Sequence, residues 1–340
     1  MLIFLTVCTA RQIPAALALS DSIKQCHPDT KLIIGLADTF PSQTPEHPTP
    51  VWPIDRYWHE DDLARRSAQY TPTEFTAATK PTFVRAVYER FTDCDTVVYV
   101  DPTTFFYQPI THELTRHPNA NLLLTPYLSR PPAHGLMPDE KHLQNVGLYT
   151  AGLLVFRRSN ATARFLTWWE GRVADRAFIR FCDGLCLDQL WLMYAPAFLD
   201  GVAVVNTPGW NVGLWNLHEN GSIQKADSNQ LFVNGVSPLI SVNFCGLTNA
   251  DDGLFPYQTR FALAARADVQ QLIGDYRERY VMTTDHHKPA YGQSPEPPVL
   301  RGWQKAVTDT LHEVSRQIET APVPDKFMAL TDRLRGLAGR

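Results

Sequence analysis

The sequence lacks the patterns that mark several large classes of protein. Its 340 residues include six cysteines, which do not occur at the paired short spacings of a zinc site. Lys and Arg number 31 against 35 Asp and Glu, without a basic run, and this balance argues against nucleic-acid binding. No window approaches the roughly 20 apolar residues of a transmembrane helix. No Gly-x-Gly-x-x-Gly motif follows the first apolar segment, which disfavours a dinucleotide-binding dehydrogenase.

The few cysteines and the N-terminal segment also bear on location. Disulfide frameworks suit small secreted domains, so the cysteines of a chain this long are expected to be reduced. Residues 1–8 are apolar, but no basic residues precede them and Arg11 follows too soon for a signal peptide. We therefore expect a cytoplasmic protein without a transmembrane segment and without a nucleic-acid partner.

Short apolar segments alternate with amphipathic ones along most of the chain. Residues 2–8 and 31–37 have the composition of buried parallel strands, and residues 13–27 between them have helical spacing, so residues 2–37 form a predicted βαβ unit. A helix is expected over 79–91, with Pro81 in its first turn. The alternation predicts an α/β fold, a single Rossmann-like domain with a mostly parallel central sheet. Further strands are expected at 96–100, 121–125, 153–157, 202–205 and 239–244, and further helices at 161–174 and 187–193.

The C-terminal segment differs from the rest. A Pro-rich stretch at 289–298 suggests a boundary, so we expect one domain over residues 1–292 and an amphipathic helical extension over 293–340. Trp303, Val307, Leu311 and Val314 recur at helical spacing. A second apolar stripe follows with Phe327, Leu330, Leu334 and Leu337, and basic residues flank it. Three interpretations stay open: packing onto the main domain, contact with a second copy in a homo-oligomer, or peripheral contact with a membrane surface.

Several short motifs together resemble one known family. Asp101 ends an apolar strand, where open α/β folds bind ligands. In chain order, the motifs are Thr79-Lys80-Pro81, Val98-Tyr99-Val100-Asp101-Pro102, Ala151-Gly152, Trp168-Trp169, Leu187-Asp188-Gln189-Leu190-Trp191 and Trp210-Asn211-Val212-Gly213-Leu214-Trp215-Asn216. In order and spacing, they resemble those of the GT-A fold glycosyltransferases, in particular the group of glycogenin and the bacterial lipopolysaccharide galactosyltransferases. The resemblance covers most of residues 1–292.

The resemblance implies a site for Mn²⁺ or Mg²⁺ that this chain carries in altered form. Family members have Asp-x-Asp at the strand end and a late His, where this chain has Asp101-Pro102-Thr103 and Asn243. Hard cations prefer anionic oxygen ligands. A site made of Asp101, Thr103 and Asn243 is therefore expected to bind a cation weakly before the donor's diphosphate arrives.

If no metal is used, another positive group must stabilise the departing diphosphate. Lys80 is expected near a helix start, where backbone N–H groups attract anions as well, and Arg85 lies one turn further on. With no family context, a solvent-exposed lysine at a helix end would be the simpler interpretation of Lys80. We predict that Lys80 and Arg85 contact the diphosphate.

Other site residues follow from the resemblance alone. Asp188 and Gln189 are expected to face the donor sugar, with a contact role and not a nucleophilic one; otherwise they would stabilise a helix start. Trp210, Asn211, Trp215 and Asn216 combine apolar faces with amide groups suited to a sugar or acceptor, or are core residues. The expected nucleotide-sugar contacts are Thr6, Cys8, Thr9, Ala10, Asp38, Lys80, Arg85, Tyr99, Asp101, Pro102, Thr103, Ala151, Gly152, Asp188 and Gln189.

The sequence thus predicts a glycosyltransferase. The expected donor is a UDP-sugar, the acceptor a glycan, a lipid-linked molecule or a small molecule, and retention of configuration is implied by the resemblance. The altered metal motif leaves one alternative, a non-catalytic relative that binds nucleotide sugars or acts as a scaffold. Lys80, Asp101, Asp188 and Gln189 are the predicted catalytic residues.

Overall fold

The structure, a computed structural model, describes residues 1–39, 48–133, 135–247, 254, 258–279 and 290–292, and single positions between 302 and 314. The chain divides into two compact units, residues 1–295 and 296–340. In the second unit, the described residues Trp303, Val307 and Val314 are helical and exposed. Most of the amphipathic extension predicted for 293–340 lies outside the described residues, so that prediction stays untested. In the described part of the chain, no helix has the length and apolar character needed to cross a membrane.

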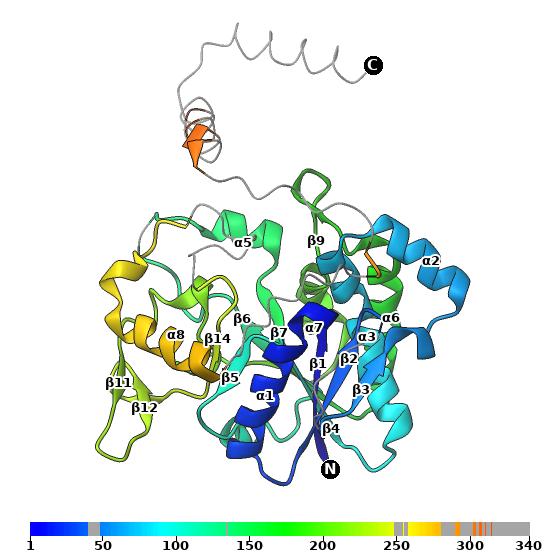
Figure 1. Cartoon of the computed structure of the whole chain (residues 1–340), viewed down its shortest axis with the longest axis horizontal. Helices are drawn as coiled ribbons and strands as arrows, with labels where there is room; N and C mark the ends of the chain where they lie inside the picture. The colour runs from blue at the N-terminus through cyan, green and yellow to red at the C-terminus, as the bar shows by residue number, and fades with distance from the viewer. Residues whose placement is uncertain are drawn as a thin grey trace, which may run out of the picture. The chain divides into compact units, whose positions relative to one another are not determined.

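A seven-stranded sheet forms the centre of the first unit (Figure 1). Its strand order is β10-β6-β7-β4-β1-β2-β3. All neighbouring pairs are parallel except the two made by β7, which runs antiparallel to β4 and to β6. The predicted mostly parallel α/β sheet is confirmed. The strands are β1 (Leu2–Cys8), β2 (Lys31–Leu36), β3 (Val51–Pro53), β4 (Thr96–Val100), β6 (Leu122–Pro126), β7 (Tyr149–Arg157) and β10 (Val202–Val204).

The order of the strands creates a switch point between β1 and β4. The chain moves outward from β1 to β2 and β3, and then crosses back to β4 on the other side of β1. At such a point, the loops leaving the two strands turn in opposite directions and open a crevice at the carboxyl ends, where open α/β sheets bind ligands. Here those ends are Cys8 and Val100, followed by Thr9 and Asp101.

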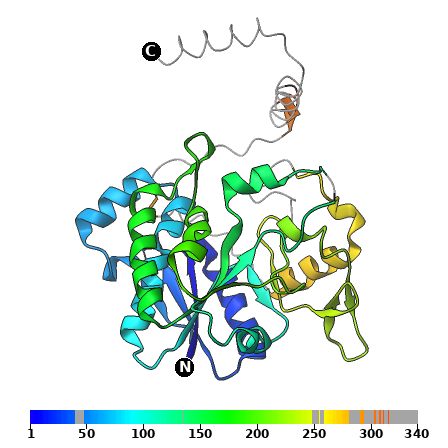
Figure 2. The ribbon, with the colours of Figure 1, turned by 180° about the vertical axis from the view of Figure 1, so that it is seen from behind.

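Helices cover both faces of the sheet. Along β1, Ile3, Leu5 and Val7 face a core built with α3 (Pro72–Arg90) and α6 (Asn160–Arg176). Phe4 and Cys8 face the opposite core, built with α1 (Ile13–Cys26). This alternation is the period of two of an extended strand, and both sets are apolar because β1 is buried on both faces. Figure 1 shows α1 in front of the sheet, and α3 and α6 cover the far face, seen in Figure 2.

Helix α3 starts earlier than predicted. The spacing suggested a start near Thr79, but the helix begins at Pro72 and Pro81 lies inside it. The start is fixed by a capping box: the Thr71 hydroxyl accepts from the Glu74 N–H (3.3 Å), and the Glu74 carboxylate accepts from the Thr71 N–H (2.9 Å). The prediction was wrong because Pro81 also fits a first turn. Lys80 consequently lies in the third turn, where the backbone N–H groups are already bonded, so no helix N-terminus adds to its charge.

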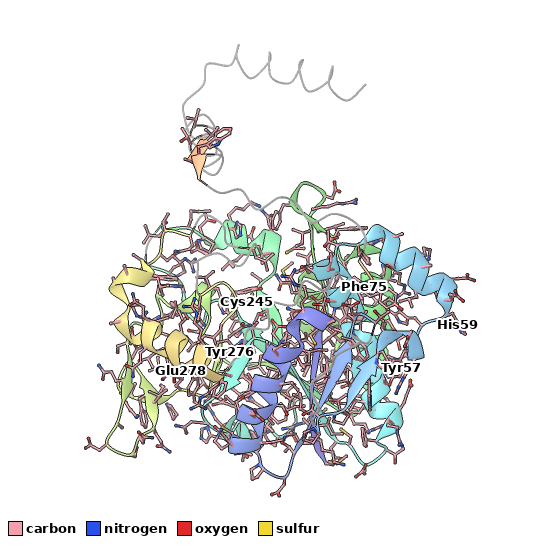
Figure 3. All side chains as sticks on the ribbon, in the orientation of Figure 1. Tyr57, His59, Phe75, Cys245, Tyr276 and Glu278 are labelled. Carbon is pink, nitrogen blue, oxygen red and sulfur yellow. The ribbon has the colours of Figure 1, made fainter. Side chains whose placement is uncertain are left out.

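A smaller layer packs beside the sheet. Strand β14 (Ser241–Asn243) pairs antiparallel with β5 (Thr104–Phe106), and helix α8 (Ala267–Arg279) covers them. Tyr276 of α8, labelled in Figure 3, stacks on Phe244 with 4.1 Å between ring centroids. This layer brings residues 241–245 next to Asp101. The remaining elements are α2 (Glu60–Gln69), α4 (Thr111–Arg116), α5 (Glu140–Val146), α7 (Ala195–Phe198), β8 (Ile179–Arg180), β9 (Leu185–Cys186), β11 (Ile223–Lys225), β12 (Leu231–Val233) and β13 (Ser237–Pro238).

Candidate active site

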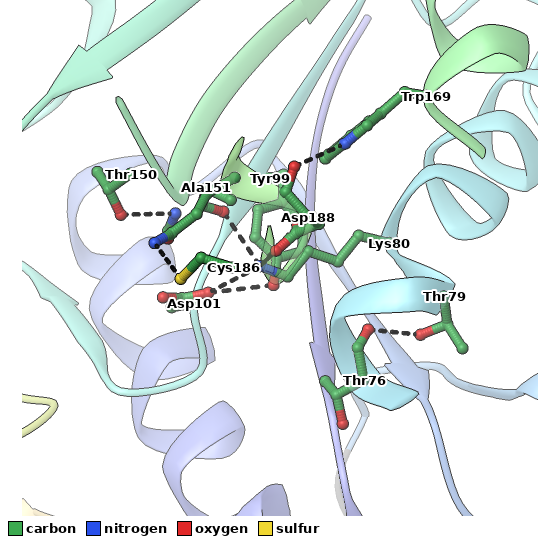
Figure 4. A network of polar contacts seen from close by, with 12 residues as sticks. Thr76, Thr79, Lys80, Tyr99, Asp101, Thr150, Ala151, Trp169, Cys186 and Asp188 are labelled. Atoms are coloured by element: carbon green, nitrogen blue, oxygen red, sulfur yellow. Dashed lines mark hydrogen bonds and ion pairs between the residues drawn. The ribbon is translucent and has the colours of Figure 1, made fainter. Parts of the chain in front are cut away.

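Two carboxylates and one ammonium group meet at the carboxyl edge of the sheet (Figure 4). Lys80 extends from α3, and its Nζ lies 3.1 Å from the Asp188 carboxylate and 3.8 Å from that of Asp101. Lys80 also donates to the Ala151 carbonyl of β7 (3.4 Å). Its side chain is 10% exposed, that of Asp188 1% and that of Asp101 29%. Asp101 is therefore the member of the cluster that a ligand can reach most easily.

The charges of the cluster depend on one another. Burial raises the pKa of Asp188, and the positive charge of Lys80 acts against that rise. One ammonium faces two carboxylates, so the cluster carries a negative charge when both acids are ionised. Lys80 is thus in the first place the counter-ion of Asp188, and a diphosphate would have to compete with two carboxylates for it. Burial and the neighbouring Asp101 charge also raise the pKa of Tyr99, whose hydroxyl donates to Asp101 (3.1 Å).

A glycine makes room for Asp101. The Asp101 N–H donates to the Gly152 carbonyl (2.8 Å), which brings the loop after β4 against β7. A Cβ at position 152 would lie 2.5 Å from Asp101 Oδ2, closer than real Cβ contacts. The Ala151-Gly152 motif has a physical reason here: Ala151 presents its carbonyl to Lys80, and Gly152 lacks the side chain that would displace Asp101.

Asn243 and Thr103 form a hydrogen-bonded chain with Asp101. The Thr103 hydroxyl (2.8 Å) and the Cys245 N–H (2.9 Å) both donate to Asn243 Oδ1. Because a backbone N–H can only donate, the amide oxygen must face Cys245, and the amide NH₂ must face Asp101 Oδ2 (3.3 Å). Asp101 therefore accepts a hydrogen bond from Asn243, the residue at which the resemblance implies a metal ligand.

This arrangement does not fit a divalent cation. A cation needs lone pairs directed at one point, but Asn243 presents hydrogens to Asp101, and its oxygen already accepts from Thr103 and Cys245. Asp101 supplies the one carboxylate, and its oxygens also contact Tyr99 and Lys80. Among the described residues, no group of three or more His, Cys, Asp or Glu side chains is arranged to hold a metal. The metal ligands Asp101, Thr103 and Asn243 predicted from the resemblance are adjacent, but they are bonded to one another.

Gln189 lies beside the cluster and is held on both ends. Its Oε1 accepts from the Tyr127 hydroxyl (2.7 Å) and its Nε2 donates to the Val146 carbonyl (2.9 Å). Gln189 starts a short 3₁₀ helix, Gln189–Tyr194, where the sequence predicted a helix over 187–193. Sequence analysis did not identify two residues that position this pair: Tyr127, and Trp169, whose indole N–H donates to the Asp188 carbonyl (3.0 Å). Trp168-Trp169 was part of the family resemblance, but no site role was predicted for it.

The predicted nucleotide contacts from the first two strands lie at the switch point. Thr6 is buried on β1, and its hydroxyl has no hydrogen-bond partner in the described structure. Burial, reinforced by Asp38, raises the pKa of the Cys8 thiol, which keeps it neutral. The buried Asp38 carboxylate accepts from the N–H groups of Ala10 (3.2 Å), Thr39 (2.8 Å) and Ala290 (2.8 Å). Asp38 thus ties the ends of β1 and β2 together, and its contact with a nucleotide stays a prediction.

Arg85 lies apart from the cluster. It pairs with Glu170 of α6 and, at 3.6 Å, with Glu89 on its own helix. Lys80 and Arg85 are five residues apart on α3, which places them on different sides of the helix. The structure therefore does not bring Arg85 together with Lys80 and Asp101.

Of the four residues predicted to contact an acceptor or sugar, three are buried and Asn216 is half-buried, and their polar groups have different partners. Trp210 donates its indole N–H to the Thr125 hydroxyl (2.9 Å). Trp215 packs edge-on against Tyr127, with 5.5 Å between centroids. Asn216 uses its amide inside the loop, accepting from the Gly213 N–H and donating to the Asn211 carbonyl (both 2.9 Å). Among these four, Asn211 is the residue whose amide has no partner on either atom.

The fold agrees with that of one class of protein. The galactosyltransferase LgtC, solved in complex with donor and acceptor sugar analogues, superposes with a TM-score of 0.51 at 15% identity, covering 84% of this chain and 98% of LgtC. At this identity the likeness shows the fold alone, and the fold is that of the GT-A glycosyltransferases.

Two proteins of known sequence are similar to this chain. The chain is 26% identical over 174 residues to the uncharacterized protein YfnF of Bacillus subtilis (strain 168), covering 51% of this chain and 57% of YfnF. It is 23% identical over 224 residues to the uncharacterized protein YfnD of the same organism, covering 64% of this chain and 68% of YfnD. The match to YfnF thus spans little more than half of that relative. No family model matches the chain.

Proposed function

We propose that this protein is a glycosyltransferase that moves a sugar, a hexose or a close relative, from a UDP-linked donor to a glycan, a lipid-linked molecule or a small molecule. One observation carries the proposal. Lys80, Asp101 and Asp188 meet at the carboxyl edge of a GT-A-type sheet, next to its switch point. Ligands of open α/β sheets bind at that place. The cytoplasmic location expected from the sequence stays a prediction.

The cluster fits a reaction at an anomeric carbon. When the bond from sugar to diphosphate breaks, positive charge develops on the sugar ring, and a fixed carboxylate beside the ring stabilises it. Asp101 is the more exposed carboxylate and can accept hydrogen bonds from sugar hydroxyls. Asp188 is buried behind it and holds Lys80, so we assign Asp188 the role of setting the charge and position of the cluster. Retention of configuration is the outcome that the family resemblance implies.

We further propose that no divalent cation takes part. The amide N–H groups of Asn243 point toward Asp101, where a cation ligand would have to present an oxygen lone pair. The departing diphosphate is then stabilised by Lys80, the positive group of the cluster, once sugar hydroxyls have engaged Asp101, the more exposed of its two carboxylate partners.

The experiment measures UDP release from UDP-glucose, UDP-galactose and UDP-N-acetylglucosamine, with EDTA and with added Mn²⁺. We expect slow release from at least one donor, and we expect EDTA to leave the rate unchanged. Release that stops with EDTA and returns with Mn²⁺ would refute the metal-free mechanism. Tight UDP binding without turnover of any donor would favour the alternative, a non-catalytic nucleotide-sugar-binding protein. If UDP does not bind either, both proposals fail.

A double variant provides a matched control for the metal. Thr103→Asp with Asn243→His places two ionic or imidazole ligands where the neutral hydrogen-bonded pair now stands. We expect the double variant to bind Mn²⁺ at least about tenfold more tightly than the native protein, measured by isothermal titration calorimetry with UDP present. Equal Mn²⁺ affinity in both proteins would show that the geometry around Asp101, and not the ligand types, controls metal binding.

A further inference from the structure

Four aromatic side chains form an exposed aromatic ridge beside α6. Trp168 belongs to α6, Trp191 and Tyr194 to the 3₁₀ helix that starts at Gln189, and Phe198 to α7. Trp168 lies 5.0 Å from Phe198 and 5.9 Å from Tyr194, measured between ring centroids, and Tyr194 stacks on Phe198. Phe198 is 57% exposed and Tyr194 is 47% exposed. Contiguous exposed apolar patches mark interaction sites, whereas single exposed apolar residues are ordinary.

The outer side of α6 continues this ridge with a regular spacing. The buried residues of α6 face the core on one side of the helix. On another side, four residues recur at intervals of four, three and four: Arg164, Trp168, Gly171 and Asp175. With 3.6 residues per turn, these intervals place the four residues on one stripe, the α6 seam, of which Trp168 is half-buried and the others are exposed. The same intervals occur where two helices pack along their length.

The α6 seam matches a second copy of itself in the antiparallel direction. In a two-fold symmetric contact, each residue that meets a second residue is met by it in return. If the axis passes midway between Trp168 and Gly171, the Trp168 side chain of one copy lies over Gly171 of the other. Arg164 of one copy then faces Asp175 of the other, at both ends of the seam. A Cβ at Gly171 would meet no atom within 4 Å, so there is open space for the indole.

The charges around the seam favour a second copy over other partners. Arg164 is exposed and has no ion-pair partner in the described part of the chain. The Asp175 side chain is 59% exposed, and its ion pair with the neighbouring Arg176 is 3.9 Å long. Arg172, one turn from Trp168, and Asp200, two residues after Phe198, add one charge of each sign. Such a mixed surface offers little net attraction to an anionic membrane or an acidic peptide, but it complements itself.

We propose that the α6 seam and the aromatic ridge form the interface of a homodimer. The α6 helices of the two copies pack antiparallel, with their axes about 8–10 Å apart. Trp168 and Phe198 supply the apolar centre, and the pairs of Arg164 with Asp175 fix the register of the helices. Aromatic side chains each bury about 150–250 Å², so four per copy provide an interface at the lower end of the range for specific complexes. This inference does not depend on the proposed transferase function.

The test measures the mass of the full-length protein in solution by analytical ultracentrifugation, from about 1 to about 100 µM. We expect a monomer–dimer equilibrium with a micromolar Kd. Phe198→Asp places a charge in the apolar centre and is expected to raise the Kd about tenfold or more. Val236→Asp introduces the same charge at a valine that is 78% exposed between β12 and β13, outside the ridge, and should leave the Kd unchanged. Circular dichroism shows that each variant is folded.

Charge reversal tests the direction of the two helices. Arg164 and Asp175 are eleven residues apart, about 16 Å along one helix, so they cannot pair within one copy. Arg164→Asp and Asp175→Arg each place like charges opposite one another between copies, and each is expected to raise the Kd several-fold at low salt. The double variant Arg164→Asp with Asp175→Arg restores opposite charges at both ends and should recover the native Kd.

Three results would overturn the inference. The protein stays monomeric up to about 100 µM, or Phe198→Asp dimerises like the native protein, or the double charge reversal is as weak as the single ones. A fourth measurement addresses a membrane. If a monomeric native protein cosediments with vesicles of phosphatidylcholine and phosphatidylserine, and Phe198→Asp does not, the ridge contacts lipid and the homodimer is refuted.

Discussion

Replacing Lys80 with Met is expected to lower the free energy of unfolding by about 3–5 kcal/mol. The Asp188 side chain is 1% exposed, and Lys80 is its ion-pair partner at 3.1 Å. Met has nearly the same volume, so the loss comes from leaving a buried carboxylate without its counter-ion and not from a cavity. Urea unfolding followed by circular dichroism measures the change.

The double variant Lys80→Met with Asp188→Asn is the control for this effect. Removing both charges leaves no buried ion, so we expect it to recover most of the lost stability. If the double variant is as unstable as Lys80→Met alone, the loss comes from packing around the Lys80 side chain, and the ion pair contributes little.

The effect of Lys80→Met should depend on pH in a defined direction. The pKa of Asp188 in the folded protein is raised above its ordinary value of 3.8, mainly by burial, and loss of Lys80 raises it further. The folded state then binds the proton more tightly than the unfolded state, so stability falls as the pH rises from near 3.8 through the folded pKa. We expect the stability difference between native protein and variant to shrink from about pH 8 to about pH 5. A constant difference would contradict a charged Asp188.

Replacing Gly152 with Ala is expected to reduce donor turnover by about a hundredfold or more. The new Cβ would lie 2.5 Å from Asp101 Oδ2 and 3.1 Å from Thr150 Oγ1. The carboxylate must then leave the position where Tyr99 and Asn243 hold it, and a displacement of about 1 Å in a positioned group has an effect of that size. The initial rate of UDP release is the measurement, and UDP affinity is expected to change little.

Gly171→Ala is the matched control for the same change in side chain. Gly171 lies inside helix α6, and a Cβ there would meet no atom within 4 Å. We expect it to keep the native rate and to gain up to about 1 kcal/mol in stability, since Ala favours the helix.

The melting temperature of the Gly152→Ala variant shows whether that variant is folded. A folded Gly152→Ala protein with native turnover would mean that the position of Asp101 does not matter for the reaction.

Local patterns predicted much of the scaffold. Residues 96–100 were assigned as a strand because an apolar run ends at Asp101-Pro102, and β4 has these bounds. The strand, helix and strand of residues 2–37 were also predicted correctly, because each element buries an apolar face of its own and this shows in the spacing of its apolar residues. Helix α3 was placed too late because Pro81 fits a first turn, whereas the capping box at Thr71 and Glu74 fixes the start.

The sequence by itself determined which chemical groups are present and at which strand end Asp101 lies. Only the tertiary structure decided what those groups do. Lys80 meets Asp188 across 108 positions of sequence, and Asn243 meets Asp101 across 142. Such contacts depend on the order in which strands assemble and on the direction of each side chain, which local periodicity does not contain. For that reason the sequence predicted Lys80 as a diphosphate ligand and Asn243 as a weak metal ligand, but it did not predict that Lys80 is the counter-ion of the buried Asp188 or that the Asn243 amide N–H groups face Asp101.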